Sequence, residues 1–496
     1  MELDWLLSFD GVTVAIVAVL LVLLVSWSYR WPSNIPPSPP SYPFVGHIPL
    51  ILKGNLPKTY KGLRAQYGDV FCLKLGMRLS VIINGPDAIR EAFIKQADVF
   101  SDRPDNFIGS VLLKKKGILA TSGEQWKRTR TLAMSTLRDF GFGKKSLESR
   151  VLEEVEDFLG VIEDQNGKPC NAKNIIQISI SNIICSIVFG ERFEYNDKKF
   201  KNLMFLMNEL FRLNTAGGVA NVMPWVRHLP GDVFQVKEII NNFQTLLNFI
   251  QEEIDEHKRT FDEDNIRDFI DAFLRQKTKH HSDDPVFEDF NVKASVLNLF
   301  VAGTETTSTT TRWAILFLLH HKDVQDKLRQ EIFTVVGSAR FPSLNDKPNM
   351  PYFQAFITEV LRKGNIAPLG VPHGAGCDIK FRGMTIPKGS LITANLGSVL
   401  NDPDTFRDPE KFNPDRYLGE DGQLTGLEKS VMAFSLGRRV CLGESLARLE
   451  LFLILTSLVQ RFELVPTDQD DLPTLLPRPG GSNAPCEFEF RAVKSN

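Results

Sequence analysis

The sequence predicts a mainly α-helical protein with a small β part, built as one large domain behind an N-terminal transmembrane helix. Apolar residues recur at helical spacing over long stretches, including 149–165, 234–261 and 444–462. Runs with strand character are short and fall at 70–85 and 384–396. Composition hardly changes after the N-terminal segment and no repeat is present, so we expect one domain, although 496 residues could form several.

Overall composition is that of a globular protein, with 43% hydrophobic and 24% charged residues, and the chain can bury a large core. The 58 basic and 60 acidic residues leave a net charge of −2, which argues against nucleic-acid binding. The six cysteines form no CxxC pair and have no regular spacing. They therefore predict neither a disulfide framework nor a zinc site, and a reducing compartment fits best.

An almost unbroken apolar run, VTVAIVAVLLVLLV, occupies residues 12–25. With the apolar residues before it, this run is long enough for a membrane span of about 20 residues. A cleaved signal peptide is the alternative, but it needs a basic N-terminal region, and the first basic residue here is Arg30. Because basic flanks stay on the cytoplasmic side, we expect residues 1–29 to form a transmembrane anchor, with the following domain in the cytosol.

The segment after the anchor is rich in proline, which predicts an extended and stiff chain over residues 30–50. We interpret it as a hinge that orients the rest of the protein on the membrane. The large domain then covers residues 51–496. Within this domain, residues 400–435 are dense in Asp, Pro and Gly, and a loop of that length is expected to be functional or held by specific contacts.

The most specific motif has the pattern Phe-x-x-Gly-x-Arg-x-Cys-x-Gly, formed by Phe434, Gly437, Arg439, Cys441 and Gly443. An apolar helix is predicted to follow, and a helix N-terminus stabilises a thiolate. Glycines allow the backbone to approach a flat cofactor, and an arginine could neutralise an anionic group on it. A buried structural cysteine is the simpler alternative, but chance would give this pattern in only about one of 10⁴ such chains.

This motif resembles the haem-binding signature of the cytochromes P-450, and the resemblance extends over the whole chain. It implies the cytochrome P-450 fold, haem b (iron protoporphyrin IX) as cofactor, and the Cys441 thiolate as the axial ligand of the haem iron. The segments PLGVPHGA and IPKGSLITANL are most similar to the animal microsomal, family-2-like branch.

Other motifs support the resemblance. Glu359 and Arg362 form a Glu-x-x-Arg pair, and Arg416 follows in a later loop. In the family, these three residues form a buried charged cluster with a structural role, which is tolerable only if all members bond to one another.

The resemblance also implies a set of residues that hold the haem carboxylates. Trp126 and Arg130 lie four residues apart, so they share a helix face. Together with Arg103, His373 and Arg439, they provide five donors for the two propionates.

A polar stretch, VAGTETTSTTTRW, interrupts a long apolar helical pattern at residues 301–313. Most of its residues are poor helix formers, and its polar centre excludes an intramembrane span. We expect the helix to open locally from Gly303 to Thr306, where hydroxyls can replace the regular ladder of hydrogen bonds. The roles of Thr307 to Thr311 are not assigned.

Within this stretch, the resemblance assigns two catalytic residues. Glu305 and Thr306 match the family's acid–alcohol pair, which delivers protons toward bound O2. Ala302 is expected to lie over the haem. The same resemblance places Ala302, Ala367 and Val371 in the substrate pocket, where few charged residues are found.

The function that follows from the resemblance is a monooxygenase that inserts one oxygen atom of O2 into an apolar substrate. Steroids or secosteroids, fatty acids and xenobiotics all qualify. One alternative is a haem-thiolate isomerase or dehydratase, which uses no O2; the intact acid–alcohol pair argues against it. Another alternative is a non-catalytic haem-binding or lipid-binding membrane protein.

The resemblance also implies partners and a location. Electrons are expected from NADPH through a membrane NADPH–cytochrome P-450 reductase, and cytochrome b5 is a second expected partner. The protein is expected in the endoplasmic reticulum membrane, with a single span, contact with membrane lipid and the catalytic domain in the cytosol. Basic residues that would suit an acidic partner are Lys127, Arg128, Arg138, Lys144 and Lys145.

Overall fold

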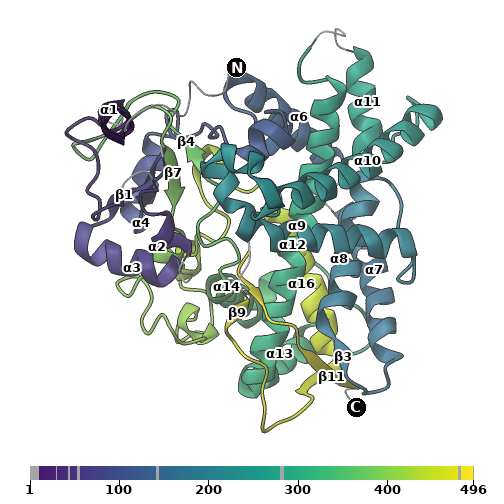
Figure 1. Cartoon of the computed structure of the whole chain (residues 1–496). Coiled ribbons are helices and arrows are strands. Elements are labelled where there is room, and N and C mark those ends of the chain that lie inside the picture. Colours follow the sequence, from purple (N-terminus) through teal and green to yellow (C-terminus); the bar gives the residue numbers. More distant parts are fainter. Residues whose placement is uncertain are drawn as a thin grey trace.

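The computed structural model describes residues 11–28, 31–42, 45–52, 56–76, 78–140, 145–279, 284–478 and 482–494. In this part of the chain, helices dominate and the strands are short, as the sequence predicts. Figure 1 shows β1, β4 and β7 on one side of the molecule and most of the long helices on the other. The mainly α-helical fold class is therefore confirmed.

The helices are α1 (Gly11–Ser28), α2 (Ile48–Leu52), α3 (Leu56–Tyr67), α4 (Pro86–Arg90), α5 (Gly117–Ala120), α6 (Gly123–Asp139), α7 (Lys145–Glu163), α8 (Ala172–Val188), α9 (Lys198–Val222), α10 (Val236–Thr260), α11 (Phe269–Lys279), α12 (Asp289–His320), α13 (Lys322–Val335), α14 (Pro351–Gly364), α15 (Gly397–Leu400) and α16 (Glu444–Arg461). Two short helical turns matter for the site, η2 (Glu91–Lys95) and η9 (Gly437–Arg439).

The strands are β1 (Val70–Leu75), β2 (Arg78–Ile83), β3 (Cys170–Asn171), β4 (His373–Gly374), β5 (Ile379–Phe381), β6 (Met384–Ile386), β7 (Leu391–Ala394), β8 (Phe462–Pro466), β9 (Pro477–Arg478), β10 (Ala484–Pro485) and β11 (Glu489–Lys494).

The largest sheet has the strand order β1-β2-β7-β4. Strands β1 and β2 form an antiparallel hairpin in which Val70 lies opposite Ile83, which confirms the strands predicted at 70–85. Strand β2 is parallel to β7, and β7 pairs antiparallel with β4, where His373 lies opposite Ile392. This sheet therefore fixes the position of His373 at its edge.

Helix α12 is the central element of the helical part, and it contacts α8, α10, α14 and α16. It contains 32 residues, which corresponds to a length of about 48 Å. Apolar side chains such as Phe300 and Trp313 are almost fully buried, so packing outweighs the low helix propensity of the threonines between them. Figure 1 shows α12 in the middle of the helical part, beside α8 and α16.

The prediction that the helix opens locally from Gly303 to Thr306 is wrong. Helix α12 continues without a break from Asp289 to His320. The hydroxyls bond within the helix instead: Oγ1 of Thr306 donates to the Ala302 carbonyl at 2.7 Å, and Oγ1 of Thr310 donates to the Thr306 carbonyl at 2.8 Å. A carbonyl oxygen has a second lone pair, so it accepts the hydroxyl without losing its backbone partner.

The charged cluster around Glu359 forms as predicted from the sequence. The guanidinium of Arg362 donates to both oxygens of Glu359 at 2.8 Å, and Nε of Arg416 donates to Oε1 at 3.2 Å. Tyr417, which the sequence did not indicate, donates its hydroxyl to Oε2 at 2.8 Å. Arg362 also donates to the carbonyls of Leu400, Pro409 and Lys411, so the cluster ties the long loop to α14.

The anchor predicted over residues 1–29 lies only partly within the described residues, which here are 11–28 and form α1. None of the helices in the described part of the chain combines the length and apolarity needed to cross a bilayer. The expected spanning helix is therefore not found there. Most of the α1 side chains whose burial the structure describes, at residues 11–20 and 22, are exposed, and Val12 and Leu20 retain 65% and 58% of their accessible surface.

Candidate active site

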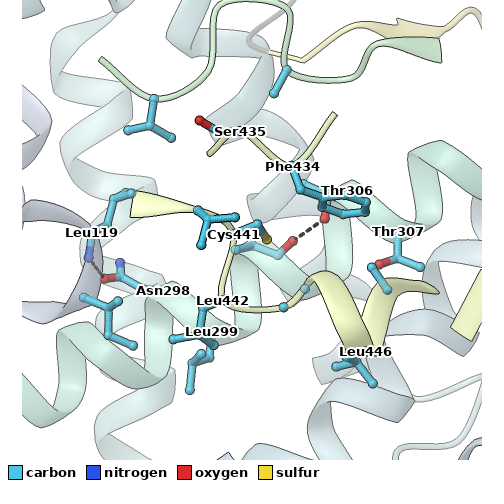
Figure 2. Close-up of a pocket in the computed structure, with 18 of the residues that line it drawn as sticks. Leu119, Asn298, Leu299, Thr306, Thr307, Phe434, Ser435, Cys441, Leu442 and Leu446 are labelled. Carbon is cyan, nitrogen blue, oxygen red and sulfur yellow. Dashed lines mark hydrogen bonds between the residues drawn. The ribbon is translucent and has the colours of Figure 1, made fainter. Parts of the chain in front are cut away.

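A cavity of about 370 Å³ lies between α12 and the segment that leads into α16. Two of its sides differ in how they are built. The helix wall is the face of α12 formed by Asn298, Leu299, Ala302, Gly303, Thr306, Thr307 and Thr310. The loop wall is formed by Ala433, Phe434, Ser435, Arg439, Val440, Cys441, Leu442 and Gly443. Figure 2 shows residues of both walls, with Thr306 of the helix wall drawn close to Phe434 and Cys441 of the loop wall.

Cys441 lies in the loop wall, just before α16. Its backbone N–H donates to the Phe434 carbonyl at 3.0 Å, which closes the turn around the sulfur. Its exposed face lines the cavity, while protein atoms surround the rest of the residue. Burial raises the pKa of the thiol, and the N–H groups of Gly443 and Glu444 and the charge of Arg130 lower it. A bound metal cation would lower the pKa much further.

The two glycines of the motif have different surroundings. Gly437 has a φ of +77°, and a Cβ there would lie 1.8 Å from the carbonyl oxygen of Phe93 in η2. The backbone therefore approaches protein rather than cofactor, which corrects the expectation from the sequence, and Gly437 does not line the cavity. Gly443 does line the cavity, and a Cβ there would meet no atom within 4 Å.

Three arginines meet at one end of the cavity, namely Arg103, Arg130 and Arg439. Arg439 is buried, donates from Nε to the Ser101 carbonyl at 2.8 Å, and lies 3.8 Å from the ring centroid of Trp126. Burial and the charges of Arg103 and Arg130 lower the pKa of Arg439 to about 8. Burial also lowers the pKa of Arg103 to about 10. The charge of Asp102 partly opposes the shift at Arg439, and a further carboxylate in the cavity would offset the remaining positive charge.

Two further groups at this end support an anionic ligand. The indole Nε1 of Trp126 is buried and has no hydrogen-bond partner among the described residues. His373 is paired through Nδ1 with the Phe100 carbonyl at 2.6 Å, and burial and the charge of Arg103 lower its pKa well below the usual range. A carboxylate in the cavity would accept from Trp126 and would offset the arginine charges on His373.

The residues therefore fit a haem group. Two propionates would satisfy the arginines and the indole N–H, and the Cys441 sulfur faces the same cavity. The structure brings together these predicted cofactor-binding residues: Arg103, Trp126, Arg130, Ala302, His373, Phe434, Arg439, Cys441 and Gly443. The pocket residues Ala367 and Val371 also line the cavity. The individual roles of all these residues stay predictions.

The acid–alcohol pair is split between two surroundings. Thr306 lines the cavity in the helix wall. Glu305 is buried behind it and does not line the cavity; its Oε1 accepts from Oγ1 of Thr309 at 3.4 Å and from Oγ of Ser482 at 3.3 Å. Burial raises the pKa of Glu305, and the charges of Arg478 and Arg312 oppose this. The pair thus consists of one hydroxyl at the cavity and one acid behind it.

Glu450 lines the cavity from α16, and the sequence reasoning missed it. It is fully buried, and neither carboxyl oxygen has a hydrogen-bond partner among the described residues. Burial raises its pKa to about 8, and the neighbouring Thr307 hydroxyl opposes the shift. An acidic residue within the apolar run LELFLILTSLV was a signal of an unusual buried carboxyl.

Comparisons with known proteins agree over nearly the whole chain. Residues 36–491 match the family model described as Cytochrome P450. The chain is 37% identical over 485 residues to cytochrome P450 2B19 of Mus musculus, covering 96% of this chain and 97% of that protein. It is 39% identical over 468 residues to cytochrome P450 2J2 of Homo sapiens, covering 94% of this chain and 92% of that protein.

Proposed function

This chain belongs to the cytochrome P450 family and is a haem-thiolate monooxygenase, and we propose that it inserts one oxygen atom of O2 into an apolar substrate at the cavity between the helix wall and the loop wall. The observation that carries the proposal is the position of Cys441 in a cavity whose helix wall contains Ala302 and Thr306. Electrons would come from NADPH through a membrane reductase.

We infer that the chain holds its haem by two groups of residues, Cys441 in the loop wall and the three arginines at one end of the cavity. Cys441 would ligate the iron, while Arg103, Arg130 and Arg439 would neutralise the propionates. The bound haem supplies the iron centre that binds and activates O2. Hydrogen bonds from the N–H groups of Gly443 and Glu444 favour the thiolate of Cys441, as a helix N-terminus does.

We infer that residues of α12 transfer the protons that the reaction needs into the cavity. In the structure the Thr306 hydroxyl donates its hydrogen to the Ala302 carbonyl. In the relay, this hydrogen would leave the carbonyl and pass into the cavity, while the lone pairs of the same oxygen accept a proton from behind. Glu305 is the nearest acid in sequence, and its raised pKa keeps it protonated to a higher pH than an exposed glutamate. We assign Glu305 and Thr306 to this relay.

The walls also support an apolar substrate. Beside the helix wall, the cavity is lined by Ile118, Leu119, Ile184, Ile366, Ala367 and Val371. Such a lining suits steroids or secosteroids, fatty acids and apolar xenobiotics, because burying apolar surface contributes about 25 cal/mol per Å².

Binding of carbon monoxide to the reduced haem protein tests the assignment of Cys441 as the iron ligand. A C441A variant should lose the Soret band that carbon monoxide gives with reduced thiolate-ligated haem, while wild-type protein shows it. A surviving band would remove Cys441 as the ligand.

NADPH-dependent oxygenation with added reductase separates a monooxygenase from the alternatives. An isomerase or dehydratase needs neither O2 nor reductase, and a binding protein converts no substrate.

We further propose that the N-terminal segment, residues 1–29, attaches the protein to the endoplasmic reticulum membrane, with the catalytic domain in the cytosol. The exposed apolar side chains of α1 support this proposal. Extraction of membranes with alkaline carbonate should leave the full chain in the pellet and release a chain that lacks residues 1–29. Release of the full chain would contradict the attachment.

For the reductase, and for cytochrome b5, we propose docking on the basic residues of α6. Arg138 is exposed, while Lys127 and Arg128 already pair with Glu124 and Asp284; Lys144 lies outside the described residues, as does the side chain of Lys145. An R138E variant should reduce NADPH-driven turnover at low salt and lose part of the salt dependence. Turnover equal to wild type would exclude Arg138 from this surface.

A further inference from the structure

The buried acid Glu305 contacts a hydroxyl from a distant part of the chain, that of Ser482. We propose that Ser482 is a positioning residue that acts through Glu305: it holds the carboxyl and passes protons from the solvent to it. This inference rests on the proposed function, because it concerns the acid of the relay. The pair of Glu305 and Thr306 can work repeatedly only if a further group resupplies the acid with protons.

The position of Ser482 is fixed by the next residue in the chain. The backbone carbonyl of Asn483 accepts from Nε1 of Trp313 in α12 at 2.8 Å. The side-chain amide of Asn483 donates to the Gly364 carbonyl in α14 at 2.7 Å. These two contacts hold the segment between α12 and the end of α14. They bring Ser482 against Glu305, although the two residues are 177 positions apart in the sequence.

Two hydroxyls that donate to the same carboxyl oxygen differ in their access to water. Oε1 of Glu305 accepts from Oγ of Ser482 at 3.3 Å and from Oγ1 of Thr309 at 3.4 Å. Thr309 is 1% exposed, whereas Ser482 is only half-buried and does not line the cavity. Of these two residues, Ser482 is therefore the one that can contact solvent water outside the cavity.

The charges around Glu305 favour a neutral hydroxyl as the group that brings the proton. Burial raises the pKa of Glu305, and the charges of Arg478 in β9 and Arg312 in α12 oppose this. Burial lowers the pKa of Arg312 to about 10, so its guanidinium is still charged at neutral pH. Two positive groups make it costly to bring a hydronium ion to the carboxyl itself. Through Ser482, the proton leaves the hydronium ion one group further out.

The transfer conserves atoms and charge. The Ser482 hydroxyl gives its hydrogen to Oε1 of ionised Glu305, and its oxygen takes a proton from a hydronium ion, which becomes water. One proton has then moved from the solvent to the carboxylate, and Ser482 is unchanged. The contacts of 3.3 and 3.4 Å to Oε1 are longer than usual for O–H···O bonds, so the carboxyl is held loosely and is free to serve Thr306 in the next step.

Holding the carboxyl without passing protons is the alternative role for Ser482, and Thr309 supplies a matched control for it. The T309A and S482A variants each remove one hydroxyl from the same carboxyl oxygen. Only S482A also removes the connection to the solvent. An S482T variant keeps a hydroxyl at this position and should therefore behave like wild type.

The main test measures proton exchange at Glu305 in the haem-loaded protein, without turnover. The carbonyl stretch of the protonated carboxyl is identified as the infrared band that E305Q lacks, and its shift is followed after mixing with D2O at pH 5. We expect S482A to slow this shift at least about tenfold, because a group that transfers the proton has been lost. T309A and S482T should exchange at the rate of wild type.

A second measurement connects this exchange with the relay. The peroxide released per NADPH consumed should rise several-fold in S482A, as it should in E305Q, and should stay at the wild-type value in T309A and S482T.

Equal exchange rates in S482A and T309A would overturn the proposal and leave Ser482 as a group that only holds the carboxyl. Slow exchange in S482A that S482T does not restore would also contradict it, because the proposal requires only the hydroxyl. Failure of the proposed relay looks different, since E305Q would then release no more peroxide than wild type, whatever the exchange rates are.

Discussion

The loop wall and the helix wall face the same cavity but are held in different ways. The loop wall depends on the neighbouring Gly437, whose backbone approaches Phe93 too closely for a side chain, and on the Glu359 cluster, which ties the preceding loop to α14. The helix wall is a regular helix whose hydroxyls bond to their own backbone, so its cavity side chains can change without loss of the helix. The comparison teaches that the backbone around Cys441 is fixed by close contacts, whereas the cavity side chains of α12 are not needed to hold its backbone in place.

The largest expected effect is at Gly437. A G437A variant would place Cβ 1.8 Å from a carbonyl oxygen at a positive φ, so we expect a loss of at least about 4 kcal/mol in the free energy of unfolding, and loss of bound haem. The control is G443A, where a Cβ meets no atom within 4 Å and the change should cost less than about 1 kcal/mol. Urea unfolding and the haem content of the purified proteins measure both. Equal stability of the two variants would show that the close approach of Gly437 to Phe93 does not hold the loop wall.

The next effect is at Glu359, which supports the loop wall through the long loop. An E359Q variant leaves the buried guanidiniums of Arg362 and Arg416 without a counter-charge, which should cost about 3 to 5 kcal/mol. D326N, which breaks the exposed pair of Asp326 with Lys322, should cost less than about 1 kcal/mol. The measurement is urea unfolding of both variants; a small loss in E359Q would show that the cluster does not hold the loop.

A pH-dependent effect is expected at Glu450, on the helix that follows the loop wall. Its folded-state pKa of about 8 lies above that of an unfolded glutamate, so the native state binds the proton more tightly. Wild type should therefore lose stability as the pH rises from 5 toward 8, by on the order of a few kcal/mol, and E450Q should lose less. Unfolding curves at several pH values measure this, with the exposed Glu410 as an E410Q control. Parallel pH profiles in wild type and E450Q would refute a protonated Glu450.

The smallest effect on stability is expected in the helix wall. A T306A variant loses a hydroxyl bonded to its own helix, so the free energy of unfolding should change by less than about 1.5 kcal/mol. Yet the peroxide released per NADPH consumed should rise several-fold, because the proton relay is broken. T310A removes an equivalent hydroxyl four residues further on and should leave the peroxide yield unchanged. Similar yields in the two variants would remove Thr306 from the relay.

The sequence predicted what depends on local motifs. The Cys441 motif, the Glu359–Arg362 pair and the strands near 70–85 were readable because each consists of neighbouring residues with a distinct chemical pattern. Tyr417 completes the charged cluster from a distant loop, and only the fold brings it to Glu359. The sequence also could not show why position 437 requires a glycine, because the residue that leaves no room for a side chain, Phe93, is more than three hundred residues away.

Two features of α12 were missed for a related reason. Helix propensity predicted an opening near Thr306, but tertiary packing and hydroxyl-to-carbonyl bonds keep the helix closed. The hydroxyl partner of Glu305 was not selected, because a serine in a loop carries no pattern of its own; Ser482 lies 177 residues after Glu305, and only the fold brings the two together. Glu450 did carry a signal, an acid in an apolar run, that periodicity alone does not interpret.

The Glu359 cluster has a consequence for biosynthesis. Arg416 and Tyr417 lie 57 and 58 residues after Glu359 in the sequence. Glu359 therefore emerges from the ribosome together with Arg362 but well before these two partners. Cys441 follows later still, after the segments that build the helix wall and the arginine cluster have been made. The residues that line the cavity are therefore complete only when translation has passed Leu451, so the cavity forms late in the synthesis of the chain.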